Sequence, residues 1–172
     1  MLYKSEYISP LGKLFMASDG YALCGLWLDG QKYFPHSLLE DAVEKSDLDI
    51  FNRTKSWLDN YFSGEKTEIS RLKLAPSGNK FRQDVWKILC EIPYGSVRTY
   101  GDIAKEIAEL YGKDSMSAQA VGGAVGHNPI SIIIPCHRVV GANGNLTGYA
   151  GGINTKIKLL ELEGLDMTKF KA

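Results

Sequence analysis

The chain has 172 residues, of which 44% are hydrophobic and 23% are charged. Such a composition is typical of an ordinary globular protein and argues against intrinsic disorder. Lys and Arg balance Asp and Glu at 20 each, so the net charge gives no indication of a nucleic-acid partner. No apolar run approaches the roughly 18 residues that a membrane span needs, and the first residues lack the apolar core of a signal peptide. We therefore expect a cytoplasmic protein with no membrane association.

The sequence has three cysteines and three histidines, namely Cys24, Cys90, Cys136, His36, His127 and His137. An odd number of widely spaced cysteines suits a reducing compartment better than a disulfide framework. No C-x-x-C motif and no helical i, i+4 histidine pair is present, so we predict neither a metal site nor a cofactor. A meeting of Cys24, His36 and Cys90 in space is the alternative that the spacing leaves open.

The N-terminal part reads as a small α/β lobe. Apolar alternation over residues 2–8, 13–18 and 21–28 predicts a β-meander, and the Asp19-Gly20 pair is a strong hairpin signal. From Asp47 the apolar spacing becomes helical up to Phe62, with Ser46 or Asp47 as the N-cap and Gly64 just past the end. A short strand over 68–74 is expected to return to the sheet, which we predict to be antiparallel.

A Pro-Ser-Gly break at 76–78 indicates a domain boundary, and divides the chain into lobes 1–76 and 77–172. Beyond it, apolar stripes predict a helix over 79–91 and a second that starts at a Thr99–Asp102 capping box and stops near Gly112. Ser115 or Ser117 would cap a third helix over 118–125. Two short helices joined by a turn that contains Gly are what a helix-turn-helix requires.

The helix over 118–125 is almost bare of long side chains. Its two interior glycines, Gly122 and Gly123, each cost about 1 kcal/mol relative to alanine. Either a neighbouring helix packs closely here or a nucleic-acid backbone or groove approaches. Only Gln119 offers a side chain that typically reads bases in the major groove, so a shape-reading contact, in the minor groove, is the better fit of the nucleic-acid readings.

Residues 130–134 are predicted to form a buried strand that Pro135 stops immediately before Cys136. An unperturbed thiol with a pKa of about 8.5 is only roughly 3% thiolate at pH 7, so a reactive cysteine needs a base. His137 is the candidate, but adjacent side chains of an extended segment point to opposite sides, which calls for a turn or an intervening water. Glu163, in a final helix over 154–163, could orient the histidine.

A buried structural cysteine is the plain alternative, because free cysteines are among the most buried residue types. The surroundings favour a site. Residues 141–152 form a glycine-dense loop that contributes little core, and loops of this kind line functional sites.

At this point the chain resembles the O6-alkylguanine-DNA alkyltransferases. The resemblance covers nearly all of residues 77–165 in the family's order, whereas the first 75 residues match only in general plan. It rests on Phe81-Arg82-Gln83-Asp84-Val85-Trp86, Tyr94-Gly95-Ser96-Val97-Arg98-Thr99-Tyr100, Ala120-Val121-Gly122-Gly123-Ala124, Asn128-Pro129, Pro135-Cys136-His137-Arg138-Val139 and Gly148-Tyr149-Ala150-Gly151-Gly152.

The resemblance implies a mechanism. Cys136 would be the nucleophile, and His137, a water and Glu163 would form the relay that yields its thiolate. The sulfur would take the alkyl group from O6 of guanine and keep it as a thioether, so that each molecule acts once. Tyr100 would donate a proton to the departing base, and Asn128 would bond the backbone between the DNA-binding helix and the active site.

The resemblance also implies a partner, double-stranded DNA containing O6-alkylguanine, bound by a monomer through the minor groove. The target nucleotide would flip out of the stack. The pocket would be lined by backbone groups of Cys136 and by Val139, Tyr149, Ala150 and Gly151. The expected DNA contacts are Thr99, Gln119, Ala120, Gly122, Gly123 and Arg138.

Two positions depart from the family pattern. Many members have an arginine that enters the base stack where this chain has Gln119, so we expect weaker contacts to phosphate or to the orphan base. Some members have a serine where this chain has Ala150, which matters little if the backbone N–H contacts the base.

The resemblance implies a ribonuclease H-like N-terminal lobe and a mainly helical, winged-helix C-terminal lobe. Three other functions remain as alternatives. A non-enzymatic lesion sensor would lack the reactive Cys136. A winged-helix regulator with a structural cysteine leaves Pro-Cys-His-Arg and the glycine-dense loop unexplained, and a cysteine hydrolase would turn over. The range of alkyl sizes and the preference between O6-alkylguanine and O4-alkylthymine are not set by the sequence.

Overall fold

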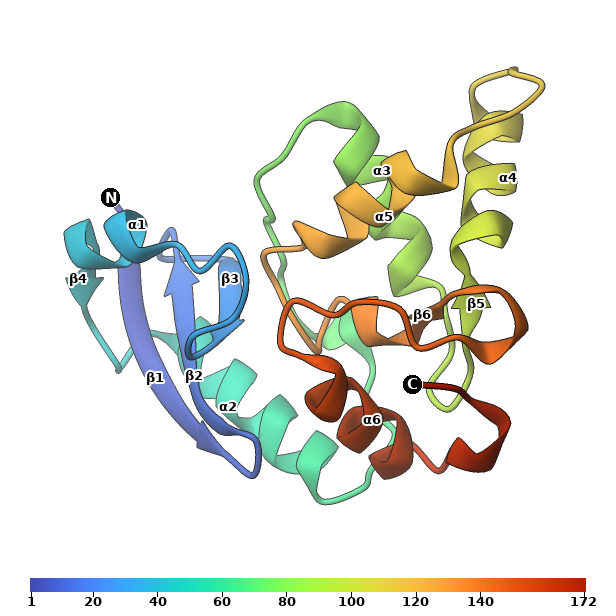
Figure 1. Ribbon diagram of the computed structural model, residues 1–172. Helices are drawn as coiled ribbons and strands as arrows, with labels where there is room; N and C mark the ends of the chain where they lie inside the picture. The colour runs from blue at the N-terminus through green and yellow to red at the C-terminus, as the bar shows by residue number, and fades with distance from the viewer. The chain divides into compact units, whose positions relative to one another are not determined.

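The computed structural model describes residues 1–172 (Figure 1). The chain forms two compact units, one made of Met1–Ser77 with Pro129–Ile133 and the other of Gly78–Asn128 with Ile134–Ala172. The chain therefore leaves the second unit just after Asn128 and re-enters it two residues before Cys136. No helix combines the length and the apolar character needed to cross a membrane.

The first unit is built on a four-stranded sheet with the strand order β3-β2-β1-β4. The strands are β1 (Tyr3–Ser9), β2 (Gly12–Ser18), β3 (Leu23–Leu28) and β4 (Val43–Glu44). β1, β2 and β3 pair antiparallel, which confirms the predicted meander. β4 was not predicted; it pairs parallel with β1, so the sheet is mixed. The turn at Gly20 requires a φ of +107°, a conformation that glycine adopts without strain.

One long helix, α2 (Asp49–Phe62), packs against β1, β2 and β3. Its helical apolar spacing buries one face, which carries Ile50, Phe51, Trp57, Leu58 and Tyr61. The predicted helix is confirmed, but its start is two residues later than Asp47, and Leu48 at the N-cap offers no side-chain hydrogen bond. A short helix, α1 (His36–Asp41), was not predicted.

Two predicted strands are wrong. Residues 68–74 contain a 3-10 turn, Ile69–Arg71, and only Leu74 bridges to the sheet, at Leu23. In 130–134, Ile130 bridges to Leu26 and the chain then turns. Ile132 has a φ of +72°, which is rare for a β-branched residue. The run of isoleucines correctly predicts that these residues are buried, but an apolar run does not distinguish a strand from a buried turn.

The second unit is mainly helical, as predicted. Its elements are α3 (Lys80–Cys90), β5 (Arg98–Thr99), α4 (Tyr100–Leu110), α5 (Ala118–Gly126), β6 (Val139–Val140) and α6 (Ile153–Leu162). The capping predictions are confirmed: Thr99 and Asp102 form the reciprocal capping box of α4, and Ser117 accepts from the backbone N–H of Ala120 at the start of α5. β5 and β6 pair parallel.

Trp86 of α3 joins this helix to α5. Its indole Nε1 donates to the carbonyl of Ala124 at 2.9 Å, and its side chain is buried. Gly78 lets the backbone approach the ring, since a Cβ there would lie 2.5 Å from an indole carbon. One face of α5 is therefore anchored in the core, and the opposite face is exposed.

Candidate active site around Cys136

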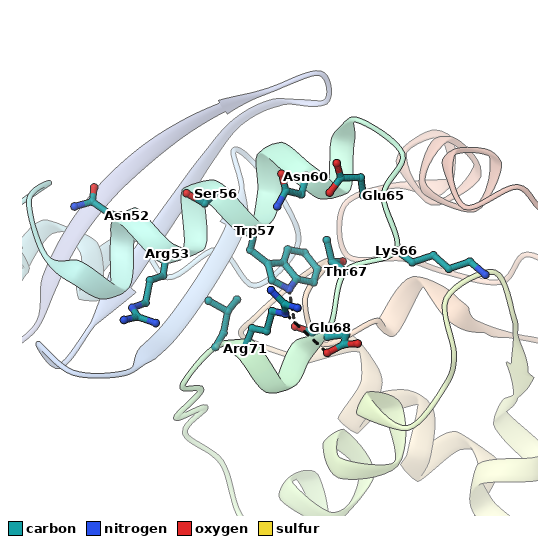
Figure 2. A pocket seen from close by; sticks show the side chains of 11 residues that line it. Asn52, Arg53, Ser56, Trp57, Asn60, Glu65, Lys66, Thr67, Glu68 and Arg71 are labelled. Atoms are coloured by element: carbon teal, nitrogen blue, oxygen red, sulfur yellow. Dashed lines mark hydrogen bonds and ion pairs between the residues drawn. The ribbon is translucent and has the colours of Figure 1, made fainter.

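A pocket of about 460 Å³ lies in the first unit between α2 and residues 65–72. Figure 2 shows Trp57 at its base, with the indole Nε1 donating to the carbonyl of Glu68 at 3.0 Å. Its charged side chains have both signs, namely Arg53, Lys66, Arg71, Glu65 and Glu68. It is lined by no cysteine or histidine, whereas Cys136 and His137 both lie in the second unit.

Cys136 begins a 3-10 turn, Cys136–Arg138, directly after Pro135. The expectation that Cys136 follows a strand is therefore wrong. Its backbone N–H donates to the carbonyl of Ile134 at 2.8 Å, and the residue is only 5% exposed. Successive side chains of a 3-10 helix still diverge, at three residues per turn. Rigid placement of the sulfur thus comes from a tight turn in the core.

Glu163 joins His137 and Arg138 in a buried cluster. Nε2 of His137 lies 2.6 Å from Oε2 of Glu163, and both side chains are fully buried. Nε of Arg138 donates to Oε1 of Glu163 at 2.7 Å, and Nη2 donates to Oε2 at 3.2 Å. Nη1 of Arg138 donates to the carbonyl of Ile92 at 2.8 Å. The sequence pattern had singled out His137 and Glu163, and the fold brings them together.

The charges of this cluster follow from its contacts. Burial alone would raise the pKa of Glu163, but the hydrogen bonds and charges of His137 and Arg138 lower it to about 2. Burial lowers the pKa of His137, against the opposing effect of Glu163. At neutral pH, Glu163 is therefore a carboxylate and His137 a neutral imidazole. The carboxylate accepts only, so the imidazole proton is on Nε2 and the basic lone pair is on Nδ1.

The thiol of Cys136 is protonated at rest. Burial raises its pKa, although hydrogen bonds from Asn128 and Tyr149 and the charge of Lys156 act in the other direction. A thiolate must therefore be generated by removing a proton, because the thiolate and not the thiol is the nucleophile.

Asn128 is the last residue of the second unit before the chain passes through residues 129–133 of the first unit, and its side chain bonds to the residues at which the chain returns. Its Nδ2 donates to the carbonyl of Ile134 at 2.8 Å, and its side chain also bonds to Cys136. The residue is 3% exposed. Asn128 thus determines where the chain re-enters the second unit, immediately before the nucleophile.

Tyr100 lies at the start of α4. Its hydroxyl donates to the carbonyl of Thr147 in the glycine-dense loop at 3.3 Å, and burial raises its pKa, so it keeps its proton at neutral pH. Tyr149, Ala150 and Gly151 are half-buried in the same loop. Val139 is fully buried in β6.

The outer face of α5 is small and accessible. Gln119, Ala120 and Gly123 are exposed and Gly122 is half-buried. A Cβ at Gly123 would meet nothing within 4 Å, and one at Gly122 would meet only the ring of Tyr100, at 3.9 Å. Close packing of a neighbouring helix, one of the two explanations of these glycines, is therefore absent. The face also lies next to Tyr100.

Arg138 lies differently from what a DNA contact needs, whereas the expected contact of Thr99 stays a prediction. Arg138 is 6% exposed, and its guanidinium is used by Glu163 and Ile92. The expectation that Arg138 contacts DNA is therefore wrong, because a buried guanidinium cannot reach a phosphate. Thr99 is half-buried, and its hydroxyl accepts from the backbone of Asp102.

Sequence reasoning missed Lys156, a fully buried lysine on α6. Its ammonium donates to the carbonyl of Val139 at 2.6 Å. A signal was present, because Lys156, Leu159, Leu160 and Glu163 recur at i, i+3, i+4 and i+7 and so share one helical face.

No group of three or more His, Cys, Asp or Glu side chains is placed to hold a metal ion.

Comparison with known proteins identifies the family. Residues 2–76 match the model of the 6-O-methylguanine DNA methyltransferase ribonuclease-like domain, and residues 80–165 match that of the corresponding DNA-binding domain. The methylated-DNA–protein-cysteine methyltransferase of Methanosarcina mazei is 52% identical over 90% of this chain and 92% of its own. That of Mycobacterium bovis is 45% identical over 95% of this chain and 93% of its own.

The fold agrees with these relatives. The crystal structure of Mycobacterium tuberculosis OGT in complex with DNA aligns at a TM-score of 0.81 and 42% identity, covering 99% of this chain and 96% of that one. The chain therefore belongs to the 6-O-methylguanine DNA methyltransferase family.

Proposed function

We propose that this protein repairs alkylated DNA by direct reversal, moving a methyl or larger alkyl group from O6 of guanine irreversibly to Sγ of Cys136. The observation that carries the proposal is the 2.6 Å contact between His137, the neighbour of Cys136, and the buried carboxylate of Glu163. It supplies a neutral base, held in one tautomer, next to a buried thiol. The same chemistry would also act on O4-alkylthymine, and the structure does not set the preference between the two lesions.

The proton of Sγ passes through a water to Nδ1 of His137, and the resulting imidazolium is stabilised by the carboxylate of Glu163. The thiolate attacks the alkyl carbon, an S–C bond forms and the C–O6 bond breaks. The guanine anion takes a proton from the hydroxyl of Tyr100, since general acid catalysis assists a poor leaving group. The tyrosinate is then reprotonated through solvent and His137 gives up the proton that it took from Sγ, so that both groups return to their neutral forms. The thioether has no route back to a thiol, so each molecule reacts once.

A thiol that is protonated at rest suits a protein that can react only once. A permanently ionised cysteine would react with any alkylating agent, whereas the raised pKa of Cys136 keeps the thiol protonated. The hydrogen bonds of Asn128 and Tyr149 are already aimed at the sulfur. They stabilise negative charge that develops there, so we assign both residues to the site.

We further propose that α5 enters the minor groove and that the lesion flips out of the duplex, because O6 cannot be reached inside the stack. The small exposed face of α5, with Gln119, Ala120, Gly122 and Gly123, would let the helix approach the backbone closely. Val139, Tyr149, Ala150 and Gly151 would then line the pocket for the flipped base. Residues 77–172 carry these functions, and residues 1–76 support them.

The protein acts as a monomer in this proposal, because one chain carries the nucleophile, the relay and the DNA-binding helix. A cytoplasmic location is consistent with its three free cysteines. A lesion sensor would not need Cys136, and a winged-helix regulator would not need the buried relay. A hydrolase would require a water to release the alkyl group from sulfur, and thioethers do not hydrolyse.

The test is an incubation of the protein with a duplex oligonucleotide that contains one O6-methylguanine, followed by intact mass and peptide mapping. We expect a gain of one methylene on Cys136, saturating at one equivalent. Cys136→Ser should gain nothing, and Cys90→Ser should react like the wild type, because burial raises the pKa of Cys90 to about 11. Lesion binding without a mass gain would indicate a sensor instead.

A further inference from the structure

The charge of Lys156 lowers the pKa of Cys136, but the residue has no task so far in forming the pocket for the base. Its side chain is fully buried on α6, and its ammonium forms no ion pair with a carboxylate. It donates instead to three backbone carbonyls, those of Val139 at 2.6 Å, Gly148 at 3.3 Å and Thr147 at 3.4 Å. Burial lowers its pKa to about 8, so it is mostly charged at neutral pH. A buried charge is costly, which calls for a function that an apolar side chain would not supply.

The three carbonyls belong to two different segments of the chain. Val139 is in β6, directly after the turn of Cys136. Thr147 and Gly148 are in the glycine-dense loop, and residues 145–152 of it contain neither a helix nor a strand. Gly148 has a φ of +50°. Lys156 thus connects a rigid edge of the site to its least regular segment.

The carbonyl of Thr147 is shared. It accepts from the hydroxyl of Tyr100 at 3.3 Å as well as from Lys156 at 3.4 Å. A carbonyl oxygen has two lone pairs and can serve both donors. In the proposed reaction Tyr100 has to turn to the leaving base, and Lys156 would keep the Thr147 carbonyl bonded when the tyrosine leaves it. The carbonyl of Val139 likewise keeps a lone pair for the edge of guanine.

We propose that Lys156 is a positioning residue of the transfer reaction, which holds Val139 to Thr147 and Gly148 so that the pocket for the flipped base is formed in advance. When Tyr100 turns to the base, Lys156 keeps the Thr147 carbonyl hydrogen-bonded, so no polar group is left unpaired. This inference rests on the proposed function of Cys136. Lys156 does not touch the reacting atoms; it acts through the carbonyls that it holds.

The test compares two reactions of the same cysteine. Single-turnover transfer from an O6-methylguanine duplex, measured at saturating DNA, needs the pocket. Alkylation of Cys136 by iodoacetamide needs the thiolate but no guanine pocket. For Lys156→Met we expect the saturating transfer rate to fall about 100-fold, the order that misplacement of about 1 Å can cost. The iodoacetamide rate should fall far less, because only the contribution of the Lys156 charge to ionising the thiol is lost there.

Lys158→Met is the matched control, because Lys158 is an exposed lysine on the same helix. It should leave both rates and the thermal midpoint unchanged. Where Lys156→Met does not fold, Lys156→Gln replaces it, since its amide still donates to one carbonyl but cannot span both segments. A Tyr100→Phe background adds a second readout: the loss caused by Lys156→Met should be smaller there, because the two residues share the Thr147 carbonyl.

An equal loss in both reactions would overturn the inference, because Lys156 would then act on the ionisation of the thiol and not on the pocket. A transfer rate of Lys156→Met within error of the wild type would also overturn it. Failure of the proposed function looks different: the wild type itself would react with iodoacetamide and leave the methylated duplex unchanged.

Discussion

Nε2 of His137 lies 2.6 Å from the carboxylate of Glu163, with both side chains withdrawn from solvent. The contact determines which ring nitrogen is basic, because an ionised carboxylate can only accept. Arg138 holds the same carboxylate through two nitrogens. The charge of Glu163 is therefore compensated by Arg138 before His137 takes up any proton, and the histidine remains available as a base.

Glu163→Gln should impair both stability and transfer. The variant leaves the guanidinium of Arg138 buried without a carboxylate, which by analogy with broken buried pairs costs about 3 kcal/mol of unfolding free energy. It also removes the charge that stabilises a protonated His137, so we expect the single-turnover rate to fall about 100-fold or more. Urea unfolding and quenched transfer assays measure the two effects. Glu161→Gln, at an exposed position of the same helix, should match the wild type in both, and a Glu163→Gln rate near the wild-type value would remove the relay from the mechanism.

Acid should destabilise the protein through Glu163. The folded-state pKa of this carboxyl is about 2, against an ordinary value of 4.5. As the pH falls through 4.5, the unfolded chain takes up the proton first, so this contribution is complete above pH 4.5 and is lost towards pH 2. The loss amounts to about 3 kcal/mol, in order of magnitude. Urea titrations at several pH values should show a steeper decline for the wild type than for Glu163→Gln; parallel curves would contradict this assignment.

Gly123→Ala should separate folding from DNA binding. Nothing lies within 4 Å of a Cβ at this exposed position, so alanine should stabilise α5, by up to about 1 kcal/mol. If the face of α5 approaches the DNA backbone, the added methyl group should nevertheless weaken binding to lesion-containing duplex. Thermal unfolding and fluorescence anisotropy test the two halves. Gly126→Ala, at the C-terminal end of the helix, is the control for the substitution itself, and unchanged affinity of Gly123→Ala would place the DNA elsewhere.

Gln119→Arg should bind DNA more tightly than the wild type. Gln119 is exposed at the start of α5, and an arginine there gains one phosphate contact, which steepens the salt dependence of log K by about 0.9. Affinities are to be measured at several matched salt concentrations. Tyr21→Arg adds the same charge at an exposed position of the first unit and should not change the salt slope. Equal or better affinity of the wild type would refute the expectation.

The sequence alone predicted most of what depends on short-range order. Alternation and an Asp-Gly turn identify the meander, and the Thr99–Asp102 box and Ser117 mark where α4 and α5 begin. These signals are local because a cap or a hairpin turn is satisfied by residues a few positions apart. The sequence also singled out Cys136, His137 and Glu163, although the last is more than twenty residues from the others.

Only the tertiary structure decided how those residues are used. The isoleucines before Cys136 are a buried turn and not a strand, since an apolar run records burial and not conformation. Arg138 faces inward to Glu163, and Lys156 reaches three carbonyls from two segments. A charged side chain in a sequence is read as solvent-exposed by default. Whether it is buried depends on partners distant along the chain, and those partners are set by the packing of the whole unit.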